Sequence, residues 1–391
     1  MRWSLWGSPS LRPQAVLAGL VALVAVSAPA PRDGVRGPLP AALDDSTFWR
    51  LSTSMSEPGG FFRSDNFVSN ETNYQRILDA LDARTPKGGV YLGVGPDQNF
   101  TYIVELRPRL AFVVDIRRQA LLQQLMYKAL FDLSPTRADF LGRLFCRPLA
   151  DSLHADVDAA VLMRALAVAV PDTACPALTL RDLDRQLTVV HTFPLSAEDL
   201  DGIAYVYQSF VEIGPDITYS GDPTRSRSGR FMPGYATMVT ETDSAGVNRG
   251  YLGSEARYQA IREFERANLL VPVVGDFAGS KALRAVGDYV REHGARVSLF
   301  YTSNVEQYLF RNPEAWRRFY ANVAALPLDP GSLFIRAVFG GGGYGYGYGY
   351  GGQRGGGYLR GEMLVTPIAT TLAAFDAGEI QGYWDVLRIS R

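Results

Sequence analysis

The sequence is poor in the residues that most often build metal sites and disulfide frameworks. It contains two cysteines and three histidines in 391 residues. Cys146 and Cys175 are too few for a disulfide scaffold or a cysteine-rich metal site, although in an oxidising compartment they could pair. The alternative is that they are two unrelated thiols. His154, His191 and His293 lie too far apart in the sequence to indicate a metal cluster.

The chain also lacks a strong charge of either sign. It has 39 basic and 40 acidic residues, for a net charge of −1, so it gives no specific signal for nucleic acid as a partner. A Gly-x-Ser-x-Gly nucleophile elbow is absent, and so is a phosphate loop ending in Gly-Lys-Ser or Gly-Lys-Thr. Hydrophobic residues make up 47% of the chain, which is ample for a folded core.

Residues 1–30 have the pattern of a signal peptide or an N-terminal anchor. Arg2 and Arg12 precede an uncharged apolar run from Ala15 to Ala28, and small residues follow it. This run is short for a membrane-spanning helix, which needs about 20 residues. Proline follows both candidate cleavage points, so an uncleaved membrane anchor stays open. We expect an exported or membrane-anchored protein, or a cytoplasmic one if the leader is not functional.

Residues 31–49 predict a linker, and residues 50–391 predict one α/β domain. Apolar runs alternate with amphipathic segments along this domain. This alternation predicts a Rossmann-like, mainly parallel sheet with helices on both faces. We expect strands at residues 90–94, 110–114, 187–193, 271–274 and 296–301, and a terminal antiparallel hairpin of residues 332–339 and 361–367.

The domain is interrupted by a helical and loop insertion at about residues 137–250. Its first part, to about residue 170, keeps a helical pattern, and Ser196 with the acids that follow it resembles a helix start. Residues 214–250 show little periodicity and predict a long loop. A Gly/Tyr-rich loop of low complexity, residues 340–357, lies inside the terminal hairpin.

The candidate site begins with two closely spaced glycines. Gly93 and Gly95 end the first apolar run, and Asp115 ends the second, about twenty residues later. Such glycines let the backbone approach a ligand, and the carboxylate can bind two ribose hydroxyls. The carboxyl ends of parallel strands share one edge of a sheet, so residues 302–304 and Asp276 are expected at the same crevice. The pattern predicts a nucleotide-type cofactor.

Five segments of the chain carry a family resemblance: residues 59–71, 92–100, 114–119, 274–279 and 301–308. They resemble class I, S-adenosylmethionine-dependent methyltransferases, and more closely an uncharacterised bacterial family that has such a domain. The resemblance covers most of residues 50–340. It implies a Rossmann-like fold, S-adenosyl-L-methionine as the cofactor and a methyl acceptor that stays unknown.

The resemblance also implies which residues contact the cofactor. Asp97 stands where a third glycine is common, and Tyr91 stands where an acid often contacts the methionine amine. Asn70 and Glu71 could supply that contact from an N-terminal segment folded over the site. The implied cofactor-binding residues are Gly93, Gly95, Asp97, Gln98, Asp115, Asn70, Glu71, Asp276 and Phe277.

Methyl transfer requires alignment of the reactants and, for some nucleophiles, a base. The candidate catalytic residues are Asp276 and Glu306 as bases, with Tyr301 and Tyr308 shaping the methyl pocket. Each has a simpler explanation: Asp276 could cap the following helix, Glu306 could be solvated and the tyrosines could be part of the core.

Two further hypotheses stay open. An exported enzyme would lack a methyl donor that is made in the cytosol, so the chain could instead be an exported or membrane-tethered, non-catalytic binding or interaction protein with a degenerate cofactor fold. The other hypothesis is an NAD-dependent oxidoreductase, since Asp115 would favour an unphosphorylated ribose, although the loop lacks the third glycine. Arg117 and Arg118 could bind a phosphate or lie on a solvated face.

Overall fold

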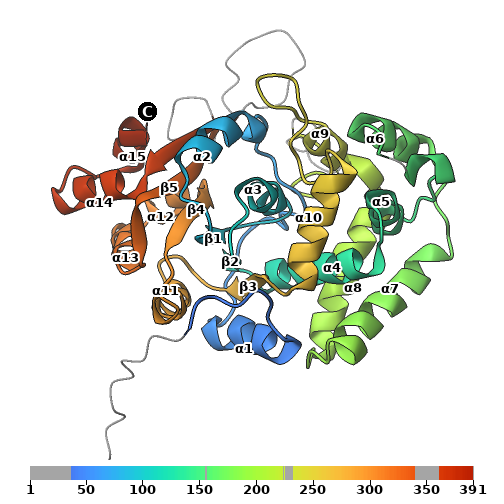
Figure 1. Cartoon of the computed structure of the whole chain (residues 1–391), viewed down its shortest axis with the longest axis horizontal. Helices are drawn as coiled ribbons and strands as arrows, with labels where there is room; N and C mark the ends of the chain where they lie inside the picture. The colour runs from blue at the N-terminus through green and yellow to red at the C-terminus, as the bar shows by residue number, and fades with distance from the viewer. Residues whose placement is uncertain (1–36, 155, 223, 225–231, 340–360, 391) are drawn as a thin grey trace, which may run out of the picture. The chain divides into compact units, whose positions relative to one another are not determined.

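The computed structural model of the chain describes residues 37–390, except 155, 223, 225–231 and 340–360 (Figure 1). The expected leader and the Gly/Tyr-rich loop therefore lie outside the described residues. In the part that is described, none of the helices combines the length and apolar character that crossing a membrane requires. The folded unit begins before the expected boundary at residue 50, because Leu39 and Leu43 are buried and helix α1 is Asp45–Met55.

One six-stranded sheet organises the structure, in the order β3-β2-β1-β4-β5-β6. The first five strands of this order are parallel, and β6 is antiparallel to β5. This confirms the Rossmann-like fold and the terminal antiparallel hairpin. The strands are β1 (Val90–Gly93), β2 (Leu110–Asp115), β3 (Leu270–Val274), β4 (Val297–Ser303), β5 (Leu328–Phe339) and β6 (Gly361–Pro367).

The central strands are continuous apolar runs because helices cover both faces of the sheet. Every residue of β1, β2 and β3 is buried. One group of helices consists of α3 (Gln98–Leu106), α4 (Arg118–Leu133) and α10 (Glu255–Arg266), which pack together, α4 also contacting β2 and β3. The other consists of α1, α11 (Ala282–Glu292) and α13 (Pro313–Ala324); α1 contacts β3 and α11 contacts β2. Beyond β6, α14 (Ile368–Asp376) and α15 (Tyr383–Ser390) end the described chain.

The insertion between α4 and α10 is helical, as expected, and gathers around α8 (Figure 1). The predicted capping at Ser196 is confirmed: its hydroxyl accepts from the amide of Asp199, whose carboxylate accepts from the amide of Ser196. A disulfide joins Cys146 to Cys175. The helices of the insertion are α5 (Arg137–Phe145), α6 (Ala159–Val168), α7 (Cys175–Arg185), α8 (Ala197–Ile213) and α9 (Tyr235–Val239).

One local prediction is wrong, and another is incomplete. The strand expected at residues 187–193 is instead a π-helical turn, η3 (Gln186–Val190), that continues α7. Leu187 is buried while Val189 and Val190 are exposed, so this β-branched run has one buried face, as a helix has. The long loop expected at residues 214–250 contains α9 and the short helical turn η4 (Gly214–Asp216).

The strand order fixes where a ligand crevice should lie. The chain moves outward from β1 through β2 to β3 and then returns to place β4 on the other side of β1. In open α/β sheets, ligands bind where the strand order reverses, outside the carboxyl ends of the strands. The carboxyl ends of β1 and β4 flank that point here.

Candidate functional site

The two glycines after β1 have different roles. A side chain at Gly93 would overlap the carboxamide of Asn99 and the ring of Tyr91, and the Tyr91 hydroxyl donates to Asn99 Oδ1 over 2.8 Å. Gly93 is therefore required by packing within the chain. Gly95 has a φ of 79°, and no atom lies within 4 Å of the place where its Cβ would stand. Only Gly95 leaves open space above the turn.

Asp115, the expected ribose-binding acid, is paired with Arg117. Its Oδ1 accepts from the backbone amide and the Nε of Arg117 over 3.0 and 3.1 Å, and its Oδ2 accepts from Nη2 over 3.0 Å. Both residues are buried. Arg117 is therefore buried and paired within the chain and does not lie on a solvated face, and Arg118 forms an ion pair with Asp199.

The segment from Glu57 to Glu71 lies over the carboxyl edge of the sheet. The amide of Glu57 donates to Val274 at the end of β3, and the amide of Gly60 donates to Ile116 after β2. The Arg117 guanidinium donates to the carbonyls of Ser64 and Asp65 in the same segment. The segment therefore occupies the edge where the nucleotide was expected.

Glu71 ends this segment at the switch point between β1 and β4. Its carboxylate accepts from the Tyr301 hydroxyl over 2.7 Å, from Gln98 Nε2 over 2.9 Å and from the Ser303 hydroxyl. Glu71 is 2% exposed. Burial raises its pKa, and these three hydrogen bonds lower it only in part. The three donors are neutral, so Glu71 is held by hydrogen bonds alone.

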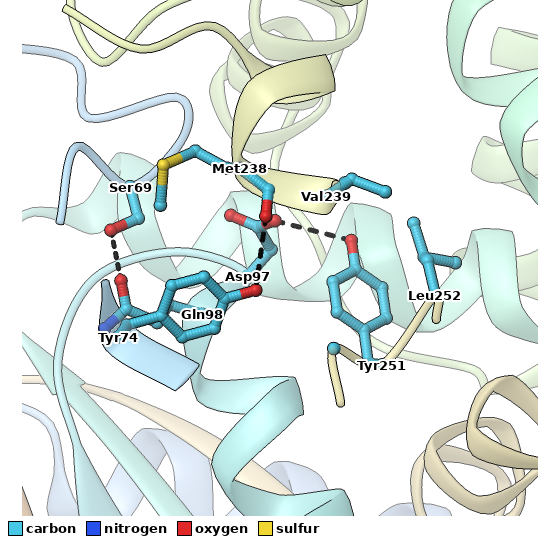
Figure 2. Close-up of a pocket in the computed structure, with 9 residues that line it drawn as sticks. Ser69, Tyr74, Asp97, Gln98, Met238, Val239, Tyr251 and Leu252 are labelled. Carbon is cyan, nitrogen blue, oxygen red and sulfur yellow. Dashed lines mark hydrogen bonds between the residues drawn. The ribbon is translucent and has the colours of Figure 1, made fainter. Parts of the chain in front are cut away.

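Asp97 faces the other side of Gln98, toward the insertion (Figure 2). It lies in a pocket with Tyr74, Met238 and Tyr251. The Tyr251 hydroxyl donates to Asp97 Oδ2 over 3.4 Å, while Oδ1 is buried and has no hydrogen-bond partner of ordinary geometry. Burial raises the pKa of Asp97 to about 7; its own amide, the Tyr251 hydroxyl and the amide of Ser69 oppose the shift.

The pocket has about 290 Å³ of space between its side chains, open mouth included. Its enclosed part holds a group about the size of one water molecule. The pocket can therefore take the end of a ligand and not a whole cofactor.

Asp276 and Phe277, the two residues expected near the adenine, both make contacts within the protein fold. Asp276 Oδ1 accepts from the amide of Ala278 over 2.9 Å, which closes the turn after β3. Phe277 is buried and stacks on Phe319, with ring centroids 5.7 Å apart. Asp276 does not cap the following helix, because the amides of Lys281 and Ala282 at the start of α11 donate to Glu57 instead.

The candidate catalytic residues do not share one cluster. Glu306 is 1% exposed and pairs with Arg336, whose Nε lies 2.5 Å from Glu306 Oε2; the Tyr320 hydroxyl also donates to Glu306. Glu306 is thus buried rather than solvated. Tyr301 is buried and binds Glu71, whereas Tyr308 packs against Phe62 with centroids 5.1 Å apart.

The structure therefore brings together only some of the expected residues. Gln98, Glu71 and Tyr301 form one hydrogen-bonded group. Asp97 is next to Gln98 in the chain, but its side chain faces Tyr251. Asn70 lies beside Glu71 in the chain and is half-buried. Sequence reasoning missed Met238 and Tyr251 of the pocket, because Met238 belongs to the insertion and Tyr251 follows it directly. Within the described ranges, no group of three or more His, Cys, Asp or Glu side chains could hold a metal ion.

The sequence profile of one protein family, described as a domain of unknown function (DUF7790), matches residues 66–154 and 224–353. Together the two ranges cover more than half of the chain. The chain belongs to this family. No curated protein matches the chain. The unmatched residues 155–223 contain α6, α7 and α8, whereas Asp97 and Tyr251, which face each other across the pocket, both lie in the matched DUF7790 ranges.

Proposed function

We propose that this DUF7790 protein is a ligand-binding protein of an oxidising compartment, and that its Rossmann-like fold does not hold a nucleotide cofactor. The observation that carries the proposal is the Asp115–Arg117 pair under the Glu57–Glu71 segment. A ribose would have to compete with the guanidinium for Asp115 and displace backbone that is bonded to β3 and to Ile116. S-Adenosyl-L-methionine does not fit these residues as they stand.

The disulfide supports the compartment. Disulfides persist mainly in exported proteins and are rare in the cytosol, and Cys146–Cys175 joins two helices of the insertion. The apolar run at residues 15–28 is consistent with export. Fractionation of tagged protein, with N-terminal sequencing of the mature form, tests this part of the proposal. Recovery of full-length protein from the cytosol with free thiols would contradict it.

A thermal-shift screen of the disulfide-intact protein tests the absence of a nucleotide site. The ligands are S-adenosylmethionine, S-adenosylhomocysteine and NAD. A ligand at about 100 times its dissociation constant stabilises the fold by about 2.7 kcal/mol, so binding would be visible. We expect no shift with any of the three ligands.

A methyltransferase with an unknown acceptor is the second candidate, and Gly95 and Glu71 favour it. Gly95 leaves open space at the turn, and Glu71 is a buried carboxyl that accepts from the neutral donors Tyr301 and Gln98. S-Adenosylmethionine carries positive charge on its sulfur and its amine, whereas the pyrophosphate of NAD is negative and would lie close to Glu71 and Asp97. The acidic surroundings therefore disfavour the oxidoreductase hypothesis.

In the second candidate, the Glu57–Glu71 segment must move to admit the cofactor. A shift with S-adenosylmethionine that disappears in Asp115→Asn would replace the proposed function by this candidate. A shift that survives in Asp115→Asn would reject the proposed function and also remove Asp115 from the site.

A further inference from the structure

Asp97 is a buried carboxyl group with few hydrogen bonds, and such a group does not stabilise a fold. A buried carboxyl group is stabilised by a cation or by a full set of hydrogen bonds. Asp97 is 5% exposed, its Oδ1 has no partner of ordinary geometry, and its Oδ2 accepts a long hydrogen bond from Tyr251. The amides of Asp97 and Ser69 also lower its pKa, but burial outweighs them. Among the described residues, the groups that shift its pKa noticeably include no lysine or arginine.

Asp97 also does not serve its helix. It occupies the N-cap position of α3, where aspartate commonly accepts a hydrogen bond from the first turn. Its side chain makes no such bond and is directed into the pocket instead (Figure 2). The carboxyl group therefore neither caps the helix nor pairs with a cation of the described chain.

The walls of the pocket are suited to a positive charge. Tyr74 and Tyr251 lie beside the carboxyl group (Figure 2), and aromatic rings attract cations. The carbonyl of Met238 also belongs to the pocket; it accepts from the Tyr74 hydroxyl over 3.3 Å and from the amide of Glu241 over 3.4 Å. An ammonium group has about the size of a water molecule and carries only donors.

We propose that this pocket binds the ammonium group of a small primary amine, which supplies the positive charge that the buried carboxylate of Asp97 lacks. The rest of the amine extends through the open mouth. The inference deepens the proposed function and rests on it only in treating the chain as a ligand-binding protein. It does not require the cofactor crevice to be open or closed.

The test compares n-butylammonium chloride with n-butanol, which has a similar shape and no charge. Binding to the disulfide-intact protein is followed by ligand-observed NMR at about pH 8, above the pKa of Asp97. We expect millimolar binding of the amine, because a ligand of so few atoms gains little free energy. Butanol should bind at least about tenfold more weakly.

Asp97→Asn keeps the shape of the side chain and removes its charge. We expect at least about a tenfold loss of amine affinity together with an unchanged or higher melting temperature, since a buried charge is removed. The matched control is Glu265→Gln, which makes the same change at another buried carboxyl whose pKa is raised to about 8 and should leave amine binding unchanged. Equal binding of amine and alcohol, no binding of the amine, or full affinity in Asp97→Asn would each overturn the inference.

Binding of S-adenosylmethionine to the wild type and to Asp97→Asn distinguishes a failure of this inference from a failure of the proposed function. If that ligand binds and Asp97→Asn weakens it, the ammonium site stands and the proposed function fails. If neither it nor the amine binds, the ammonium site fails and the absence of a nucleotide site stands.

Discussion

Arg117 binds both carboxylate oxygens of Asp115, the residue two positions before it, and both side chains are 7% exposed. In Rossmann-like domains an acid at this position binds a ribose. Here the acid, Asp115, is bound by Arg117 of the same chain. The pair also ties the end of β2 to the carbonyls of Ser64 and Asp65. One guanidinium thus satisfies the acid and anchors the segment that covers it.

We predict that Arg117→Met destabilises the fold by about 3–5 kcal/mol, because it leaves Asp115 as a buried charge without its partner. Chemical unfolding in urea at neutral pH measures the effect. The control is the double variant Asp115→Asn/Arg117→Met, which leaves no charge behind and should be more stable than the single variant. An unchanged unfolding midpoint in Arg117→Met would show that the pair does not hold the segment.

The sheet could be predicted from the sequence because each strand is identified by its own residues and not by distant contacts. Strands covered on both faces are continuous apolar runs, and β2 is one, with all six residues buried. The capping at Ser196 could be predicted for the same reason, since Asp199, its partner, lies three residues away. The prediction of a strand at residues 187–193 is wrong because a short apolar, β-branched segment fits a strand or one face of a helix equally well.

The surroundings of the candidate site residues could not be predicted, because their partners lie far away in the sequence. Glu306 was expected to be a base or a solvated acid, but Arg336, 30 residues later, makes it part of a buried pair. His191 lies between Asp45 and Asp132, with its ring nitrogens 2.9 and 2.7 Å from their carboxylates. Nothing in the local sequence of these residues indicates such partners, because the fold brings them from distant segments.

We predict that Glu265→Gln stabilises the protein at alkaline pH. Burial raises the pKa of Glu265 to about 8, against an ordinary value of 4.5; the charge of Lys128 opposes the shift. Between these values the folded state holds a proton that the unfolded state has lost, so stability falls as pH rises through this window.

The variant has no group that titrates in this window, and the two pKa values make it roughly 4 kcal/mol more stable than the wild type at about pH 8. At about pH 4 the carboxyl is protonated in both states to a similar extent, so the advantage should become small. Urea unfolding at several pH values measures the difference. A constant difference across the range would mean that Glu265 titrates normally in the folded protein.

We predict that the disulfide contributes about 3–4 kcal/mol, the chain-entropy value for a loop of this length. Cys146 and Cys175 are 29 residues apart, and the loop between them contains η2 (Asp151–His154) and α6. The double variant Cys146→Ala/Cys175→Ala should therefore melt at a lower temperature than the oxidised wild type. Reduced wild-type protein is the matched control and should resemble the double variant; no change on reduction would mean that the bond does not form.

The last prediction concerns Glu306, whose carboxylate is held by Arg336 and by the Tyr320 hydroxyl in a fully buried group. Removing one member of such a pair leaves an unpaired buried charge, which costs about 3–5 kcal/mol. Replacing both members by apolar residues of similar size is far less costly, and is neutral or stabilising in some proteins. We therefore expect Glu306→Met to lower the unfolding midpoint strongly and Glu306→Met/Arg336→Met to restore much of it.

Amine binding separates this structural role from a functional one. Glu306 lies in a buried group with Arg336 and Tyr320 and is not one of the residues that line the Asp97 pocket. The double variant should therefore bind n-butylammonium with the affinity of the wild type once it is folded. If it folds to wild-type stability but loses amine binding, Glu306 acts on the ligand site, and its assignment to packing is wrong. If it binds normally, the buried pair serves the fold alone.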